Sequence, residues 1–251
     1  MAWLPVQDTP GSNTVNSTTS GTTLSCTAFG SAVTIGNIVV VFLWGGNGAN
    51  AQPSSISVTD NGATPNTYTK LFLEPGKSIG SGWCAIFAGA ISSNPLSGNL
   101  IPKVTVGDSS TLLNICASEF SGGTATTDGT AIGANASTTT APKPGSMSTS
   151  VAGSLLLACM ADDSGSNPDT ITTPSGYTST GKQTNGASQQ CGNGCWQILT
   201  GTVTGNNPAW NSQPGWSACQ AALQVASGGV TDTPQPTLIA YQELHPACWQ
   251  E

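Results

Sequence analysis

Charge is scarce in this sequence. Only 7% of its 251 residues are charged, with five lysines, one histidine and no arginine, against roughly 25% charged residues in an average globular protein. A nucleic-acid-binding surface needs clustered basic side chains to displace counterions, so a net charge of −7 excludes that function. The single histidine excludes a site with two or three imidazole ligands. Without arginine, bidentate recognition of phosphate is not expected either.

Long apolar segments and helical periodicity are also missing. No run approaches the ~20 apolar residues of a membrane-spanning helix, and the longest, residues 38–44, suits a buried strand. The first residues lack the basic and apolar regions of a signal peptide. We therefore expect no membrane span. We also expect that either the chain leaves the cell by another route or the sequence is that of a mature form. Solubility is expected to rest on hydroxyls, amides and a modest acidic excess.

The residues that are abundant predict an all-β protein. Thr and Val fit a pleated sheet, while Gly, Asn and Pro supply turns. Strand-length apolar runs alternate with such turns, which is typical of an antiparallel β-sandwich of the jelly-roll or Greek-key type. Strands are expected near residues 22–29, 37–45, 55–60, 66–73, 82–91, 101–106, 111–120, 145–150, 153–161, 169–173, 176–182, 194–204 and 215–226.

The chain divides into a body and two arms. Residues 1–20 are expected to form an extended N-terminal arm, 21–227 the sandwich body, and 228–251 a linker and docking tail. Two stretches of the body, 21–122 and 145–226, look like copies of each other. The matched blocks are 36–41 with 153–158, 80–89 with 192–201, and 115–117 with 218–220. Two such halves would stack to bury one apolar face each, joined by a polar surface loop near 121–144.

Eight cysteines permit disulfides without proving them. Cys116 and Cys159 lie inside apolar runs and are expected to be free core residues. Cys191 and Cys195 flank Gly192-Asn193-Gly194 and are the best disulfide candidates. Zinc is the alternative for this pair, but no second close cysteine pair completes a site.

Chemistry-bearing side chains give little support for catalysis. His245, the only histidine, lies in the tail, where catalytic geometry is hard to hold. Glu119 ends an apolar strand and is expected to accept hydrogen bonds from the turn at residues 121–123. No catalytic residue, cofactor or resident metal is predicted. The loop at residues 162–169 gathers oxygen groups, which leaves calcium as an alternative to ordinary turn chemistry.

Two further features bear on binding. Trp210 and Trp216 flank a turn-rich loop, which suggests a glycan contact as an alternative to loop packing. Apolar residues also lie in the arms, and we expect them to dock on a neighbouring subunit by strand addition rather than fold back. These assembly residues are Trp3, Leu4, Leu238, Ile239, Tyr241, Cys248 and Trp249.

Residues 35–122 resemble a known group of proteins. Residues 36–41, the hairpin 58–62 with 66–69, and the strand end 119–122 follow an order similar to jelly-roll-like β-sandwich proteins of tailed-phage virions and bacterial surfaces. The hairpin departs from their pattern, because residues 63–65 are inserted before Asn66. The resemblance implies a virion or cell-surface protein and carries over no catalytic residue.

Together these features predict a non-enzymatic structural protein. We expect a phage capsid decoration protein, or a tail or fibre component, that forms a homo-oligomer and contacts a capsid or tail lattice protein. The alternative is a carbohydrate-binding module or adhesin, located outside the cell or on its surface.

Overall fold

The computed structural model describes residues 2–10, 13–15, 22–46, 52–77, 82–107, 112–136, 139–162, 171–184, 191–211 and 215–226. These residues contain fifteen strands and no helix, which confirms the all-β class. The strands are β1 (Leu4–Asp8), β2 (Asn13–Val15), β3 (Thr23–Ser25), β4 (Ile38–Gly46), β5 (Ile56–Thr59), β6 (Thr69–Glu74), β7 (Gly82–Ala90), β8 (Lys103–Val106), β9 (Leu112–Ser121), β10 (Gly123–Thr127), β11 (Ile132–Ala136), β12 (Leu155–Asp162), β13 (Thr178–Thr184), β14 (Cys191–Ile198) and β15 (Trp216–Val225).

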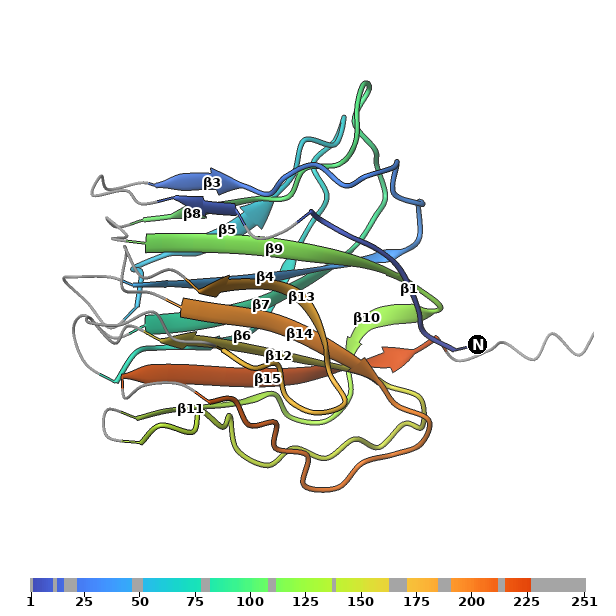
Figure 1. The fold of residues 1–251 in the computed structure, drawn as a ribbon. Coiled ribbons are helices and arrows are strands. Elements are labelled where there is room, and N and C mark those ends of the chain that lie inside the picture. The colour runs from blue at the N-terminus through green and yellow to red at the C-terminus, as the bar shows by residue number, and fades with distance from the viewer. Residues whose placement is uncertain are drawn as a thin grey trace, which may run out of the picture.

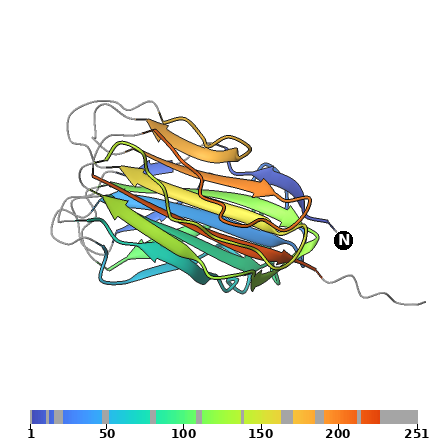
Figure 2. The ribbon, with the colours of Figure 1, turned by 90° about the horizontal axis from the view of Figure 1, so that it is seen from below.

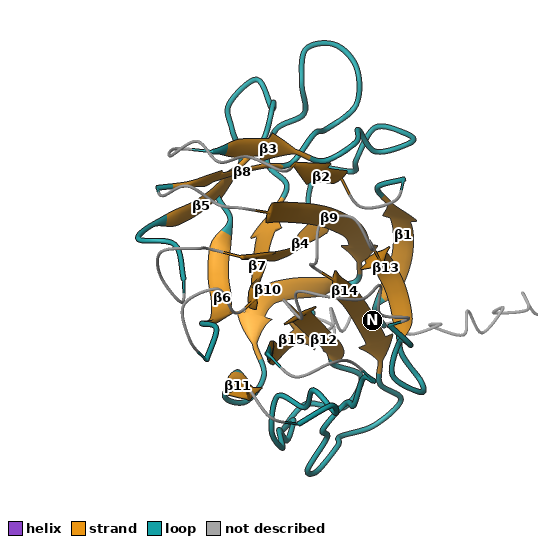
Figure 3. Ribbon diagram, turned by 60° about the vertical axis from the view of Figure 1, so that its left-hand side comes forward, coloured by secondary structure: helices purple, strands orange, loops and turns teal. Residues whose placement is uncertain are grey.

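The strands build three antiparallel sheets (Figures 1 and 3). The first sheet has the order β1-β9-β4-β7-β6, and β2 also pairs with β9. The second sheet has the order β10-β15-β12-β14-β13, and β11 also pairs with β15. A small third sheet, β3-β8-β5, covers the outer face of the first. The view from below shows the long strands of the first and second sheets running across the molecule (Figure 2).

The central strands of the two large sheets are buried on both faces. All nine residues of β4 and all eight of β12 are inaccessible to solvent. One face of β4 packs on the second sheet through Val40 and Phe42, and the other packs under the third sheet through Val39 and Val41. Antiparallel sheets often leave one face in water, which produces alternation. Double coverage explains why residues 38–44 form a continuous apolar run instead.

The space between the two large sheets is filled by aromatic rings packed on glycine. A Cβ atom at Gly192 would lie 2.1 Å from Cδ1 of Trp44, and one at Gly194 would lie 2.5 Å from Cβ of Phe42. The rings of the first sheet therefore pack directly on the backbone of β14. This close approach requires glycine at both positions, because any side chain there would overlap a buried ring.

The two large sheets correspond to the two predicted copies. Strands β9-β4-β7-β6 and β15-β12-β14-β13 have matching places in their sheets. Phe42 pairs with Cys116, and Cys159 pairs with Cys219, in agreement with the matched blocks. Gly36 and Gly153 precede the equivalent strands β4 and β12 by two residues, and both have a positive φ, +92° and +82°.

The register of the remaining strands refines this comparison. Phe42 also pairs with Ile86, and Cys159 pairs with Gly194. The strand pairing therefore aligns Ile86 with Gly194, which differs by four residues from the match of 80–89 with 192–201 made in the sequence. The edge strands β6 and β13 carry a register irregularity at the same place, between Lys70 and Phe72 and between Ser179 and Gly181. Bulges tend to be retained within families. An internal duplication would produce these coincidences, and it stays a prediction.

Several local expectations differ from the structure. The N-terminal segment is not an arm outside the body, because β1 and β2 pair with β9 and Trp3 is 1% exposed in the core. The expected loop at 121–144 contains β10 and β11, which extend the second sheet. The expected strand at 145–150 forms only an isolated bridge from Met147 to Asn206.

Candidate functional site

Most of the described carboxylates are internal. Of the six that the structure describes, only Asp8 is exposed; the other five, Asp60, Glu74, Glu119, Asp128 and Asp162, are buried. The described surface therefore carries few carboxylates, and the other six of the twelve acidic residues lie outside the described residues. Buried carboxylates require hydrogen-bond partners, and those partners show what the acids do.

Glu119 connects the turn before β4 to strand β1. Its Oε1 accepts hydrogen bonds from the Thr34 N–H at 2.8 Å and from Asn37 Nδ2 at 2.6 Å. Its Oε2 accepts from Gln7 Nε2 at 2.6 Å. The donors are not those of the turn at residues 121–123 that the sequence suggested. With its oxygens occupied and its side chain fully buried, Glu119 is a structural group.

Asp128 binds the turn before β12 in the same way. It accepts from the N–H and hydroxyl of Ser150, the Val151 N–H and the Ser154 hydroxyl, at 2.6–3.0 Å. Desolvation raises the pKa of this carboxyl, but the four hydrogen bonds outweigh it and hold the pKa below its usual value. The Asp128 N–H donates to the carbonyl of Ala222 at 2.9 Å.

The two carboxylates bind equivalent turns from different strands. Val151 and Ser154 occupy the places in the second copy that Thr34 and Asn37 occupy in the first, and Ala222 stands at the place of Glu119. The second sheet has no carboxylate at this place on its strand, and Asp128, which follows β10, supplies one instead.

Asp60 organises the hairpin that contributes to the resemblance. Its Oδ1 accepts from the N–H of Gly62 at 2.9 Å, and its Oδ2 accepts from Asn66 Nδ2 and the Tyr68 hydroxyl, both at 2.8 Å. Asn66 Oδ1 in turn accepts from the N–H groups of Ser92 and Ser93. Burial and the neighbouring Asp60 raise the pKa of Tyr68. These residues hold a loop in place through hydrogen bonds within the chain.

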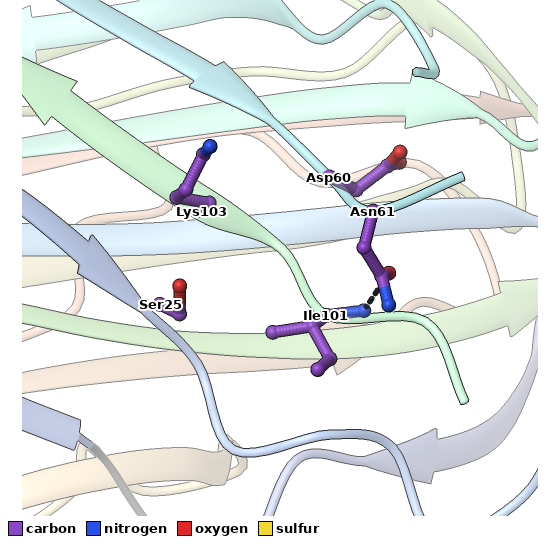
Figure 4. A pocket seen from close by; sticks show the side chains of 5 residues that line it. All are labelled: Ser25, Asp60, Asn61, Ile101 and Lys103. Carbon is purple, nitrogen blue, oxygen red and sulfur yellow. Dashed lines mark hydrogen bonds between the residues drawn. The ribbon is translucent and has the colours of Figure 1, made fainter. Parts of the chain in front are cut away.

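A small pocket opens beside this hairpin, lined by Ser25, Asp60, Asn61, Ile101 and Lys103 (Figure 4). Its volume is about 160 Å³, below the ~300 Å³ at which ligand sites for small molecules usually begin. The Ile101 N–H donates to Asn61 Oδ1 across its floor at 2.7 Å. The pocket is therefore a gap between the third sheet and its turns rather than a site for a sugar ring.

The tryptophans proposed for glycan contact are inside the protein. Trp210 is 3% exposed and its Nε1 donates to Asn193 Oδ1 at 3.0 Å. Trp216 is 5% exposed and its Nε1 donates to the Thr139 carbonyl at 2.8 Å. Both rings cover the outer face of the second sheet, so neither presents a face to a sugar. Among the described tryptophans, only Trp196 is even partly exposed.

None of the seven described cysteines is in a disulfide, and all seven are buried. Cys116 and Cys159 lie in the core without a disulfide, as expected. Cys191 and Cys195 do not bridge each other, because four residues of extended strand separate Cα atoms by about 13 Å, beyond the ~7 Å limit for a disulfide. Three other thiols, Cys84, Cys159 and Cys219, lie together between the two large sheets.

Glu74 lies near these thiols at the junction of β6 and β11. Its Oε1 accepts from Asn135 Nδ2 at 2.6 Å. The pKa of Glu74 is raised to about 7, because burial, the largest cause, outweighs the hydrogen bond from Asn135, and Cys84 contributes a smaller rise. Glu74 thus titrates near neutral pH between two sheets. Neither sequence position nor spacing indicated this, because the burial comes from β11, which was expected to be loop.

Exposed large apolar side chains are few among the described residues. The described residues include four exposed large hydrophobic side chains, and three of them, Leu4, Val6 and Ile35, lie on β1 or next to the loop bonded to it. Gln7 holds this loop through Ser31, and Glu119 holds it through Thr34. We call Leu4, Val6 and Ile35 the β1 edge.

The last described residue lies close to the β1 edge. The Ala226 N–H donates to the Gly122 carbonyl at 3.0 Å, and the preceding Ser121 pairs with Leu4. Figure 1 accordingly shows the end of β15 beside the N-terminus. The tail residues Leu238, Ile239, Tyr241, Cys248 and Trp249, together with His245, lie outside the described residues.

The described part of the chain has neither a metal-binding cluster nor a membrane-spanning helix. It contains no cluster of three or more His, Cys, Asp or Glu side chains suited to a metal ion, and no helix long and apolar enough to cross a membrane. Residues 163–170, most of the loop considered for calcium, are outside the described ranges. Comparison of the chain with protein-family models, curated proteins and solved structures found no match.

Proposed function

We propose that this protein is a non-enzymatic structural component that assembles on a virion surface, as a phage capsid decoration protein or a tail or fibre component. The observation that supports this function most is the β1 edge: exposed apolar residues on an edge strand, beside the point where the tail leaves the body. Edge strands with exposed apolar residues invite pairing with another chain.

The internal chemistry supports the same proposal. The carboxylate oxygens of Glu119, Asp128 and Asp60 accept hydrogen bonds from turns of their own chain. These carboxylates thereby fix the turns of the body and take no part in a surface site. Such a body suits a geometric role, in which it presents a surface and is fixed to its neighbours by contacts at its edges.

The partner we propose for the β1 edge is the tail of a second copy. The eleven residues 227–237 span up to about 36 Å when extended, which is the reach that this proposal gives to residues 238–241 of one subunit. Strand addition would satisfy the outer hydrogen-bonding groups of β1 and cover Leu4 and Val6.

Light scattering tests this assembly. The full chain should have a mass above the 25.1 kDa of one copy. Deletion of residues 228–251, or the combined change Leu4→Thr, Val6→Thr and Ile35→Thr, should yield a monomer with an unchanged circular dichroism spectrum. Lys70→Thr, on the opposite edge of the same sheet, is the matched control and should assemble normally.

A full chain that stays monomeric over a wide concentration range would contradict self-assembly. In that case, co-sedimentation with purified particles separates a decoration protein, which needs its lattice, from a protein with no place on a virion.

A further inference from the structure

The core between the two large sheets contains a close pair of thiols. Cys84 belongs to β7 in the first sheet and Cys219 to β15 in the second. Their Sγ atoms are 3.5 Å apart, and both side chains are fully buried. Contact between two cysteines from facing sheets has no role in the proposed function, and apolar residues of similar size would fill the same space.

We propose that Cys84 and Cys219 are a disulfide site that joins the two large sheets when the chain folds in an oxidising environment. A disulfide needs an S–S distance of about 2.05 Å, so the two sulfurs have to approach each other by about 1.5 Å. The proposal requires side-chain rotation and a shift between the sheets that bring the two Cα atoms within the ~7 Å limit for a disulfide. No backbone has to cross another, since the two sulfurs already face each other.

The reaction is a thiol–disulfide exchange with a small disulfide such as oxidised glutathione. One protein thiolate attacks the small disulfide, forms a mixed disulfide and releases one reduced glutathione. The second protein thiolate then attacks the mixed disulfide, forms the Cys84–Cys219 bond and releases the second glutathione. The two protein thiols lose two hydrogens in total, and these appear on the two glutathione molecules.

The neighbouring thiol of Cys159 has a further partner of its own. It donates to the carbonyl of Leu43 on β4 at 3.4 Å. Cys84 donates to the Cys219 sulfur and to the Cys159 carbonyl, both at 3.5 Å, and its side chain also interacts with that of Cys159. Cys159 is therefore the matched control: a thiol of the same core, next to Cys219 across the β12–β15 pair, that is not expected to join the bond.

Burial decides when the bond forms. A small disulfide cannot reach sulfurs that are fully covered. Exchange therefore takes place during folding or opening of the chain, when the two sheets are apart. A chain folded under the reducing conditions of a cytoplasm keeps both thiols. A chain that folds or opens in an oxidising medium acquires a link that spans most of the body and restricts the unfolded state.

The test uses the full chain, refolded from denaturant with either oxidised or reduced glutathione. Cleavage after lysine places Cys84 as the sole cysteine of residues 78–103, while Cys219 lies in residues 183–251. Oxidised material should yield these two peptides as one linked species, with Cys219 as the bonded residue on fragmentation, and a higher urea midpoint than the reduced material. Cys159→Ser should retain the link, whereas Cys84→Ser and Cys219→Ser should lose it.

Peptide mapping of the unaltered chain decides the matter even if a variant fails to fold. Recovery of Cys84 as a free thiol after oxidative refolding to the native spectrum would overturn the proposal, and so would a link from Cys84 to any other cysteine. Self-assembly does not enter this measurement, so its failure leaves the proposed function untouched.

Discussion

Glu74 should make the stability of this protein fall as the pH rises toward neutrality. Its pKa of about 7 in the folded protein exceeds its usual 4.5. Between these values the folded state retains a proton that the unfolded state releases. Unfolding is therefore favoured by raising the pH, and the stabilisation present below pH 4.5 is lost as the pH passes through about 7.

The size of the effect follows from the shift. One pKa unit corresponds to about 1.4 kcal/mol, so the full shift amounts to about 3 kcal/mol as an upper limit. Glu74→Gln removes the titration and keeps an oxygen that accepts from Asn135 Nδ2. Between about pH 5 and about pH 8, the free energy of unfolding should fall less for the variant than for the original protein. At about pH 8 the variant should be the more stable of the two.

Urea unfolding followed by tryptophan fluorescence measures both proteins across this range. Asp128 does not interfere, because its lowered pKa places its loss of stability below pH 3.8, in acid. The difference between the two proteins isolates Glu74 from the remaining titratable groups. Parallel pH dependences, or a variant that is less stable than the original at about pH 8, would refute the assignment of a raised pKa to Glu74.

Two further changes test the packing and the buried acids by the same unfolding measurement. Glu119→Gln places an amide NH2 group against donors from Gln7, Thr34 and Asn37 and should cost about 2–4 kcal/mol; a change within experimental error would show that these hydrogen bonds are not formed. Gly192→Ala directs a methyl group into Trp44 and should cost about 3 kcal/mol, whereas Gly201→Ala, with no atom within 4 Å of the added carbon, serves as the neutral control. Equal effects of the two alanines would contradict the close packing of the sheets.

The long strands were predictable because their own residues specify them. Residues 37–45, 82–91 and 111–120 were expected as strands, and β4, β7 and β9 lie within one residue of those bounds at every end. Apolar side chains in a run of strand length, bounded by glycine and asparagine, favour a buried strand wherever they are placed. The strands β10 and β11 were missed because their polar residues become strands only by pairing with β15.

The sequence by itself determined the all-β class, the buried central strands and the absence of a basic or histidine-rich site, because these depend on composition and on local pattern. Tertiary structure alone decided which groups remain accessible. Trp210 and Trp216 are covered by the packing of the second sheet, Trp3 lies in the core, and Cys84 meets Cys219 from a strand distant in sequence. Burial of a side chain and contact between distant residues depend on what other segments lie against them, and local sequence does not contain that information.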